Sequence, residues 1–354
     1  MKIEKEIIVN QVLENPALAI RELCNRDFYW FLRYFWPVVS SSEFVPNWHI
    51  EYICGELQGI AERVASRLPK EHDLIINVPP GTTKSITCSI MFPIWCWTLW
   101  HWMWFITASY SADLSLKSAR FSRELIRSAR FQQIYPELWL SKDVVSDFQV
   151  SNRNSGVIGG DRFSTSVGGT LMGFHGDILI VDDPLDPRRA ASDLELQTAN
   201  DWIDLNLSTR KTDKAVTPLI LIHQRLHQND PTGHLLAKSR LKIKHVCLPG
   251  EINSERYVEK VNPPELIGRY IDGLLDPVRM NVDNLAELEE SLGQYGYAGQ
   301  IGQDPAPPSG GMFQVDRFAI VDTFPDEKEL VHVVRAWDKA GTAPKKGSEP
   351  SWTV

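Results

Sequence analysis

Two short stretches carry the residues with the clearest chemical potential. The first, residues 78–85, reads Val-Pro-Pro-Gly-Thr-Thr-Lys-Ser, follows an apolar run and precedes residues that can form a helix. Strand, loop, Lys-Ser and helix is the order found in phosphate-binding loops. The N-terminus of such a helix offers unpaired N–H groups and the positive end of its dipole to an anion. We therefore expect Lys84 to reach the outer phosphates of a nucleotide and the Ser85 hydroxyl to hold Mg²⁺.

The loop departs from the common pattern G-x-x-x-x-G-K-[ST] at both glycines. Val78 occupies the first glycine position and Thr83 the second, so only Gly81 is expected to adopt a positive φ easily. On these residues alone, a turn that happens to contain Lys-Ser explains the stretch equally well. If the loop binds phosphate, the residues expected to line it are Pro80, Gly81, Thr82, Thr83, Lys84 and Ser85.

The second stretch, residues 178–184, reads Ile-Leu-Ile-Val-Asp-Asp-Pro. A continuous apolar run suits a parallel strand buried on both faces, and ligands bind at the carboxyl ends of such strands. This is the form of a Walker B strand, in which Asp182 would bind Mg²⁺ and Asp183 would polarise the attacking water. A strand that ends in an acidic turn is the competing interpretation. Adjacent carboxylates repel each other unless a cation is near. A phosphate-binding loop upstream and this strand downstream together therefore favour the nucleotide site over an acidic turn.

A third apolar run, residues 218–222, ends in His223 and Gln224. Polar groups at this position can sense a γ-phosphate and couple it to motion. The alternative is an ordinary strand end followed by a helix that Asp230 and Pro231 begin.

The remaining elements are expected to position these groups. We predict helices within residues 1–35 and 48–67, a strand at 102–108 and a later strand near 144–150. Trp48 and His49 could contact a base or serve the fold. The helix after residue 111 places four arginines on one side, and they form either a solvated face paired with acids or a contact to phosphates or a subunit: Arg120, Arg123, Arg127 and Arg130.

Composition narrows the class of protein. A chain of 354 residues usually forms two domains, and its net charge of −8 does not favour a wholly basic nucleic-acid binder. The five cysteines are scattered, which suits a reducing cytosol, and the N-terminus lacks a signal-peptide core. Residues 90–108 are long enough to span a membrane, but Pro93 and His101 interrupt them. We therefore expect a helix end, a turn and a buried strand there, and no membrane partner.

Six segments, in this order, resemble the large terminase subunit of tailed bacteriophages, a DNA-packaging motor. The resemblance runs from about residue 25 to the end of the chain, and the order of the motifs is its most specific part. The segments are residues 78–85; 107–111 with the arginine helix; 169–184; 224–233; 292–300 with 303–305 and 310–313; and 335–342.

The resemblance implies an α/β fold: a RecA-like (ASCE) P-loop ATPase with a central, mainly parallel sheet, then a linker and an incomplete RNase H-like segment. The implied domains are 1–250 for the ATPase with its N-terminal cap, 251–311 for a linker or lid, and 312–354 for the start of a nuclease. Carried over by position, Lys84 and Ser85 are the Walker A pair, Asp182 is the Walker B metal ligand, Asp183 is the catalytic acid and Gln224 lies near the coupling motif. Family motors also use an arginine supplied between subunits, for which the candidates are Arg162 first, then Arg120 or Arg123.

The nuclease part of the resemblance rests on Asp338, which matches the family's first nuclease metal ligand. Hydrolysis with two metals needs several carboxylates that hold ions roughly 3.5–4 Å apart. No later carboxylates stand between Asp338 and the last residue, Val354, except Glu349 in a polar stretch. We therefore expect a chain truncated early in its nuclease domain, naturally or by engineering, without endonuclease activity.

The implied function is ATP hydrolysis that powers translocation of double-stranded DNA into a viral procapsid. The implied cofactors are ATP and Mg²⁺, with a nuclease Mg²⁺ or Mn²⁺ only in a complete domain. The implied partners are double-stranded DNA, a portal protein, a small terminase subunit and further copies in a ring, in the cytoplasm of a host that carries the phage or prophage. Two alternatives remain open: a helicase-like RecA-fold enzyme, which would need a second such domain, and an assembly module that binds a nucleotide without hydrolysing it.

Overall fold

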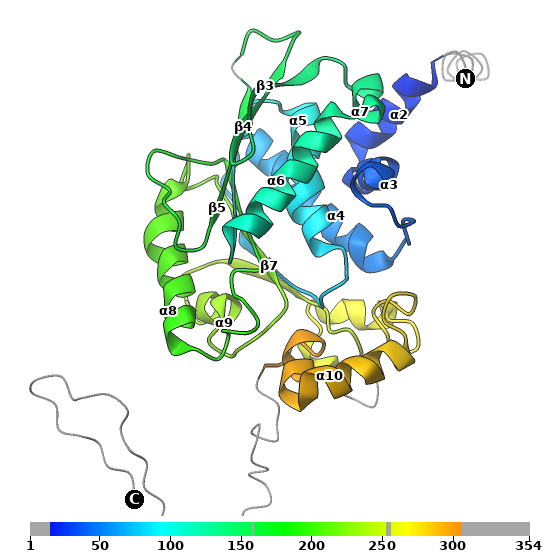
Figure 1. Ribbon diagram of the computed structural model, residues 1–354, viewed down its shortest axis with the longest axis vertical. Helices are drawn as coiled ribbons and strands as arrows, with labels where there is room; N and C mark the ends of the chain where they lie inside the picture. Colours follow the sequence, from blue (N-terminus) through cyan, green and yellow to red (C-terminus); the bar gives the residue numbers. More distant parts are fainter. Residues whose placement is uncertain (1–14, 158, 253–255, 306–354) are drawn as a thin grey trace, which may run out of the picture. The chain divides into compact units, whose positions relative to one another are not determined.

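The computed structural model describes residues 15–157, 159–252 and 256–305 (Figure 1). Contacts along the chain separate residues 1–311 from residues 312–354. Asp338 and the predicted nuclease segment at 312–354 lie outside the described residues.

An eight-stranded sheet forms the centre of the first unit, residues 1–311, in the order β3-β4-β5-β2-β6-β7-β1-β8. The pairings among β5, β2, β6, β7, β1 and β8 are parallel, whereas β3 and β4 add an antiparallel edge. The strands are β1 (Asp73–Asn77), β2 (Phe105–Ser109), β3 (Leu138–Val144), β4 (Asp147–Asn152), β5 (Gly160–Ser166), β6 (Ile178–Asp182), β7 (Leu219–His223) and β8 (Ile243–Cys247).

The strand order confirms the predicted α/β fold with a central, mainly parallel sheet. Strand β7 lies between β1, which precedes the predicted phosphate-binding loop, and β6, which is followed by Asp183. The register pairs Asn77 with His223 and Asp182 with Ile222. The carboxyl ends of three neighbouring parallel strands therefore meet at one edge of the sheet, and each end carries one of the predicted polar stretches.

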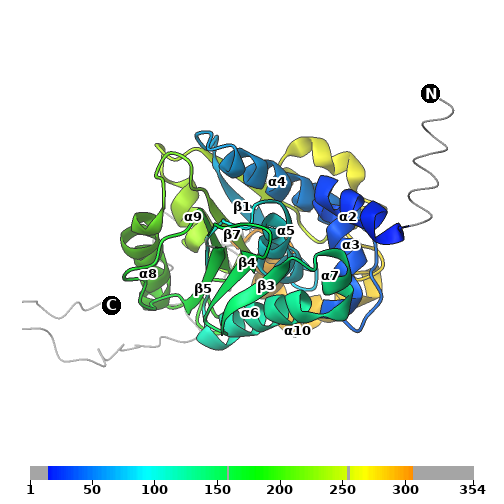
Figure 2. The same cartoon turned by 90° about the horizontal axis from the view of Figure 1, so that it is seen from above.

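Helices cover both faces of the sheet (Figures 1 and 2). Successive side chains of each strand point to opposite faces. Leu74 and Ile76 of β1 pack into the larger core with α2–α7, while Ile75 packs into a second core with the helices on the other face. The helices of the first face are α2 (Pro16–Arg26), α3 (Phe28–Val39), α4 (Trp48–Ala65), η1 (Ile86–Met91), α5 (Phe92–Leu99), α6 (Ala112–Arg127) and α7 (Ala129–Ile134). On the other face lie α8 (Asp193–Asp201), η2 (Trp202–Asn206), η3 (Leu207–Arg210) and α9 (Pro231–Leu236).

The tryptophan-rich stretch that could resemble a membrane span is part of the core. Helix α5 ends at Leu99, and β2 begins at Phe105, a little later than predicted. Trp95 and Trp97 are fully buried, and Trp97 packs edge-on against Phe105 at 5.4 Å between ring centroids. None of the helices in the described part of the chain is long and apolar enough to cross a membrane.

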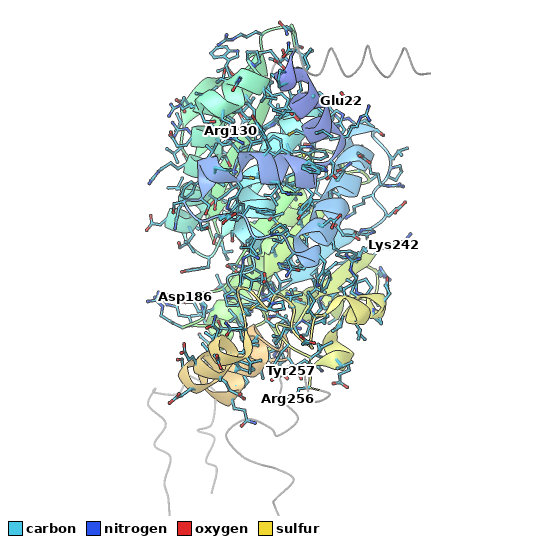
Figure 3. All side chains as sticks on the ribbon, turned by 90° about the vertical axis from the view of Figure 1, so that its right-hand side faces the viewer. Glu22, Arg130, Asp186, Lys242, Arg256 and Tyr257 are labelled. Atoms are coloured by element: carbon cyan, nitrogen blue, oxygen red, sulfur yellow. The ribbon has the colours of Figure 1, made fainter. Side chains whose placement is uncertain are left out.

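Residues 256–305 pack into the larger core through Leu285, Tyr297 and Ile301, among others. They contain the turns η5 (Val258–Lys260) and η6 (Pro264–Arg269) and helix α10 (Val282–Gln300), which changes direction at Gly293. Arg256 donates to the Tyr257 hydroxyl at 3.1 Å. Both residues are labelled near the lower end of Figure 3.

Candidate functional site

The loop between β1 and η1 makes two left-handed turns of the backbone. Gly81 has φ +80°, as expected, and Thr83 has φ +65°, although a β-branched residue rarely adopts this conformation. The expectation that Gly81 alone would turn in this way is therefore wrong. The Thr82 hydroxyl donates to the carbonyl of Pro79 at 2.7 Å, and the carbonyl of Thr83 accepts from the N–H of Thr87 at 3.0 Å. These bonds lead the loop directly into the helix.

His49 supports the loop from α4. Its side chain is fully buried, and Nε2 lies 3.3 Å from the carbonyl oxygen of Thr82. Burial lowers the pKa of His49 to about 4, so the ring is neutral at physiological pH and its Nε2–H can donate to that oxygen. Of the two interpretations of His49, the geometry favours a structural role. Trp48 packs on the other side against Tyr270, at 5.6 Å between ring centroids.

Three predicted residues from three elements converge beside the loop. Lys84 Nζ donates to Asp183 Oδ1 at 2.9 Å and also to Oε1 of Gln224. Lys84 and Gln224 are buried, whereas the Asp183 side chain keeps 25% of its exposure and can meet solvent. Since β7 lies between β1 and β6, the strand order itself brings the loop lysine between the ends of the two other strands.

Neighbouring strands hold Asp183 in a strained backbone conformation. Its φ is +46°, a left-handed value that costs a non-glycine residue free energy. Its N–H donates to the carbonyl of Ile222 at 2.8 Å, and its carbonyl accepts from the N–H of Tyr110 at 2.9 Å. Strain that surrounding strands enforce in this way is typical of functional sites.

Asp182 is buried with one oxygen engaged and the other free. Its Oδ2 accepts from the Ser89 hydroxyl at 2.8 Å, while Oδ1 has no hydrogen-bond partner among the described residues. Burial and the adjacent Asp183 hold the pKa of Asp182 above its usual range, although Lys84 and the hydroxyls of Ser89 and Ser85 oppose this shift. A buried, unpartnered carboxylate oxygen is costly unless a cation meets it.

A cavity of about 330 Å³ lies beside Asp182. Ser85, Asp182 and Asp183 line it on the sheet side, and Lys117 of α6 lies among the residues opposite. Mg²⁺ in nucleotide sites takes one or two carboxylates, with phosphate and water oxygens as its other ligands. Asp182 Oδ1 and the Ser85 hydroxyl fit this requirement, so the residues present suit a Mg²⁺-bound nucleotide.

Two of the three arginines proposed for an intersubunit role are buried. Arg162 on β5 is completely buried, so its guanidinium cannot reach a neighbouring subunit, and the expectation that it acts in this way is wrong. Arg123 is also buried, and its Nε donates to Asp143 Oδ1 at 2.6 Å. Arg127 forms an ion pair with the same carboxylate. Arg120 is exposed and is the one of the three candidates that the structure leaves accessible.

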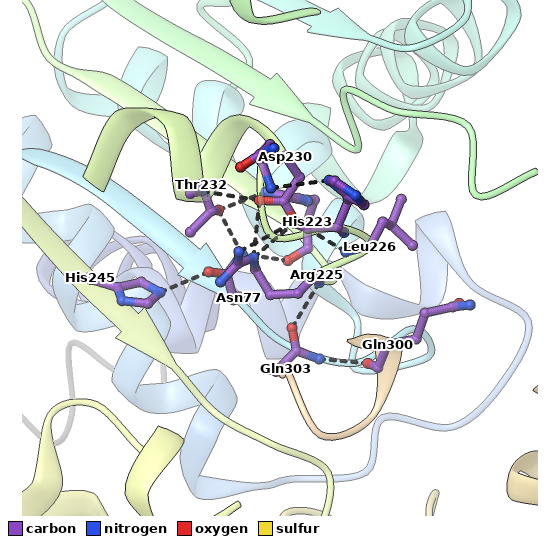
Figure 4. A network of polar contacts seen from close by, with 12 residues as sticks. Asn77, His223, Arg225, Leu226, Asp230, Thr232, His245, Gln300 and Gln303 are labelled. Carbon is purple, nitrogen blue, oxygen red and sulfur yellow. Dashed lines mark hydrogen bonds and ion pairs between the residues drawn. The ribbon is translucent and has the colours of Figure 1, made fainter. Parts of the chain in front are cut away.

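A polar network, drawn in Figure 4, anchors the end of β7 at His223, directly before Gln224. Asn77 at the end of β1 donates to the carbonyl of His223 and to the Thr232 hydroxyl, each at 3.0 Å. His223 Nε2 contacts the same hydroxyl at 2.7 Å. Sequence reasoning missed Asn77 and Thr232, although a polar residue that closes an apolar strand is a recognisable signal.

The same network continues to the C-terminal end of α10. Asp230 begins α9 as predicted, accepting from the N–H of Gly233, and also pairs with Arg225 Nε at 2.9 Å. The N–H of Arg225 donates to Oε1 of Gln303 at 3.0 Å, and Gln303 in turn donates to the carbonyl of Gln300 at 2.5 Å. One residue after Gln224, the chain is therefore bonded to the segment that follows α10.

Comparison with known proteins yields structural matches only. No protein-family model matches the chain, and no curated protein matches it. Solved structures of bacteriophage large terminases do match, with low sequence identity. The large terminase of bacteriophage HK97 is 10% identical with a TM-score of 0.47, over 74% of this chain and 51% of that one. The ATPase domain of the Thermus phage P74-26 large terminase is 12% identical with a TM-score of 0.44, over 70% and 96%.

A third match is the large terminase of a thermophilic bacteriophage in complex with ADP. It is 8% identical with a TM-score of 0.36, over 69% of this chain and 51% of that one. The chain thus spans about half the length of the HK97 terminase and of the ADP-bound terminase, and most of the isolated P74-26 ATPase domain.

Proposed function

We propose that the chain hydrolyses ATP and uses the released free energy to move double-stranded DNA into a viral procapsid. The observation that supports hydrolysis best is the convergence of Lys84, Asp183 and Gln224 beside the free oxygen of Asp182. A lysine, a partly exposed carboxylate and a metal-type carboxylate at one sheet edge are the groups that phosphoryl transfer to water requires.

Each residue has a distinct proposed role. The N–H groups of residues 81–85 and the Lys84 ammonium bind the phosphates, Pro80 lines the loop, and Ser85 and Asp182 hold the metal ion. Mg²⁺, when bound there, would offset the negative charge of the phosphates. Asp183 accepts a hydrogen bond from the attacking water and orients it, while Gln224 reports on the phosphate end of the nucleotide.

The contact between Lys84 and Asp183 suggests how nucleotide binding prepares the site. The Lys84 ammonium lies 2.9 Å from Asp183 Oδ1. A triphosphate carries more negative charge than one carboxylate and therefore competes for the lysine. Once Lys84 turns to the phosphate, Asp183 loses its cation and is free to bind water. Nucleotide binding is therefore the step that frees Asp183 to orient the attacking water.

The DNA-packaging part of the proposal rests on the order of the sequence motifs. We propose double-stranded DNA, a portal protein, a small terminase subunit and further copies in a ring as partners, in the host cytoplasm of a phage or prophage. With a net charge of −8, DNA contact must come from a local basic surface and should weaken steeply with salt. The nuclease role of Asp338, with Mg²⁺ or Mn²⁺, remains a proposal for a longer protein.

Phosphate release from ATP, with and without double-stranded DNA, tests the function. Lys84→Ala and Asp183→Asn should each lower the rate at least about 100-fold, since each removes a group that acts directly on the reacting phosphate or water. Lys142→Ala on the exposed edge strand is the matched control and should hydrolyse ATP at the wild-type rate. A near-normal rate in either site variant would refute the assignment. Tight ATP binding by the wild type without turnover would instead favour a nucleotide-binding assembly module.

A further inference from the structure

The helix that follows the phosphate loop begins as a π-helix. This turn, η1 (Ile86–Met91), is wider than an α-helical one, and such turns are rare and often lie at functional sites. Two of its carbonyl groups accept hydrogen bonds from side chains of other elements. Arg162 Nη1 on β5 donates to the carbonyl of Ser89 at 2.7 Å, and the Ser122 hydroxyl on α6 donates to that of Ile90 at 2.9 Å.

Arg162 is the centre of these contacts. Its Nη1 also donates to the Ser122 hydroxyl at 2.7 Å, and its Nε lies 3.2 Å from the Thr107 hydroxyl and 3.3 Å from that of Ser164. The side chain is completely buried, and its Nη2 has no partner among the described residues. Four hydroxyl and carbonyl oxygens thus bind the guanidinium, because a buried charge without such partners would cost much free energy.

The carboxylate that can offset the charge of Arg162 is Asp182, and one residue, Ser89, connects the two side chains. No carboxylate of the described residues forms an ion pair with Arg162. Burial lowers the pKa of Arg162 to about 9, and the negative charge of Asp182 opposes that shift. Ser89 connects the two groups, because its carbonyl accepts from Arg162 while its hydroxyl donates to Asp182 Oδ2 at 2.8 Å.

We propose that Arg162 is a positioning residue that acts through Ser89 to orient Asp182. Arg162 fixes the carbonyl of Ser89, which fixes the direction of the Ser89 hydroxyl. The hydroxyl holds Oδ2, and Oδ1 is therefore the oxygen left for a metal ion at the cavity. This inference rests on the proposed function, in which Asp182 is a ligand of Mg²⁺. It replaces the role of Arg162 between subunits with one inside its own subunit.

A purely structural Arg162 would stabilise the core and leave metal affinity unchanged. The two roles are separated by Ser89→Ala, which removes the hydroxyl on Asp182 but keeps the carbonyl that Arg162 binds. Arg162→Lys keeps the charge but loses the fork of donors. Ser115→Ala is the matched control, because Ser115 is a buried serine whose hydroxyl donates to the carbonyl of Thr107 and touches neither Arg162 nor Asp182.

The measurement is the affinity of Mn²⁺ for the protein with ADP bound, followed by the electron paramagnetic resonance signal of free Mn²⁺. Ser89→Ala and Arg162→Lys should weaken Mn²⁺ binding about 10- to 100-fold, as is usual when a partner of a metal ligand is lost. ADP affinity without metal, and Mn²⁺ binding by Ser115→Ala, should stay at wild-type values. The thermal midpoint of each variant shows whether it is folded.

Two results would overturn the inference in distinguishable ways. If folded Ser89→Ala binds Mn²⁺ as tightly as the wild type, Ser89 does not orient the carboxylate and the inference is wrong while the proposed function stands. If the wild type binds no Mn²⁺ with ADP, the proposed function fails and the inference fails with it. Should Arg162→Lys not fold, the Ser89→Ala result alone decides.

Discussion

Replacing Thr83 with glycine should make the protein more stable. Thr83 has φ +65°, and a left-handed conformation costs an L-residue about 1–2 kcal/mol. Glycine removes this cost but adds freedom to the unfolded chain, worth about 0.5–1 kcal/mol in the opposite direction. The Thr83 hydroxyl makes no hydrogen bond in the described structure, so little else is lost. The net expectation is a gain of about 0.5–1 kcal/mol in the free energy of unfolding.

Urea denaturation of the wild type, Thr83→Gly and Thr83→Ala measures this gain. Alanine removes the same outer atoms but keeps a Cβ atom in the left-handed region, so it should gain little. Gly81→Ala is the converse case: at φ +80° it should lose about 1 kcal/mol, although a Cβ atom there would meet no neighbour within 4 Å. The reasoning is refuted if Thr83→Gly is less stable than the wild type while Thr83→Ala is unchanged, because the backbone of Thr83 would then not be strained.

Two further predictions concern stability away from the phosphate loop. Burial and the neighbouring Asp147 raise the pKa of Asp161 to about 7, so the folded state keeps a proton that the unfolded carboxyl releases near pH 4. The free energy of unfolding should therefore fall by about 1–2 kcal/mol, after solvent screening, as pH rises from about 4 to 7. Urea denaturation at pH 5 and 8 should show a smaller fall for Asp161→Asn than for the wild type. An equal fall in both proteins would contradict the prediction. Gln303→Ala should cost about 1–3 kcal/mol because it leaves the N–H of Arg225 unpaired. Gln300→Ala, which keeps the carbonyl that Gln303 binds, is its control, and an equal loss in both would show that the bond to Arg225 is not the cause.

The sequence predicts best those elements whose pattern of apolar residues is compatible with only one kind of burial. The apolar runs before Asp182 and His223 suit only strands buried on both faces, and the structure has β6 and β7 there, buried at every residue. Strands β8 and β3 were not predicted, whereas β4 overlaps the strand expected near residues 144–150. The pattern in these strands is weaker because their residues are partly exposed, as at Trp139, and the chain there mixes charged and apolar residues.

The candidate site shows a different limit. Sequence order places Lys84, Asp183 and Gln224 each after a strand, but not next to one another. Their contact depends on β7 lying between β1 and β6, and this order is a property of the whole sheet. The turn at Thr83 was missed for a related reason: residue preference argues against a left-handed threonine, whereas the surrounding loop and the helix after it enforce the conformation.

Arg162 shows most clearly what the sequence conceals and what it offers on a closer physical reading. An arginine is usually exposed, and the family resemblance made Arg162 the first candidate for a group presented to a neighbouring subunit. Strand side chains alternate between faces, however, and Gly160 and Ser164 share its face of β5. These small residues leave room for a long side chain between the sheet and α6, and the hydroxyls there can satisfy its donors. An arginine flanked at two-residue steps by glycine and serine in a strand is therefore better interpreted as a buried guanidinium that serves its own sheet.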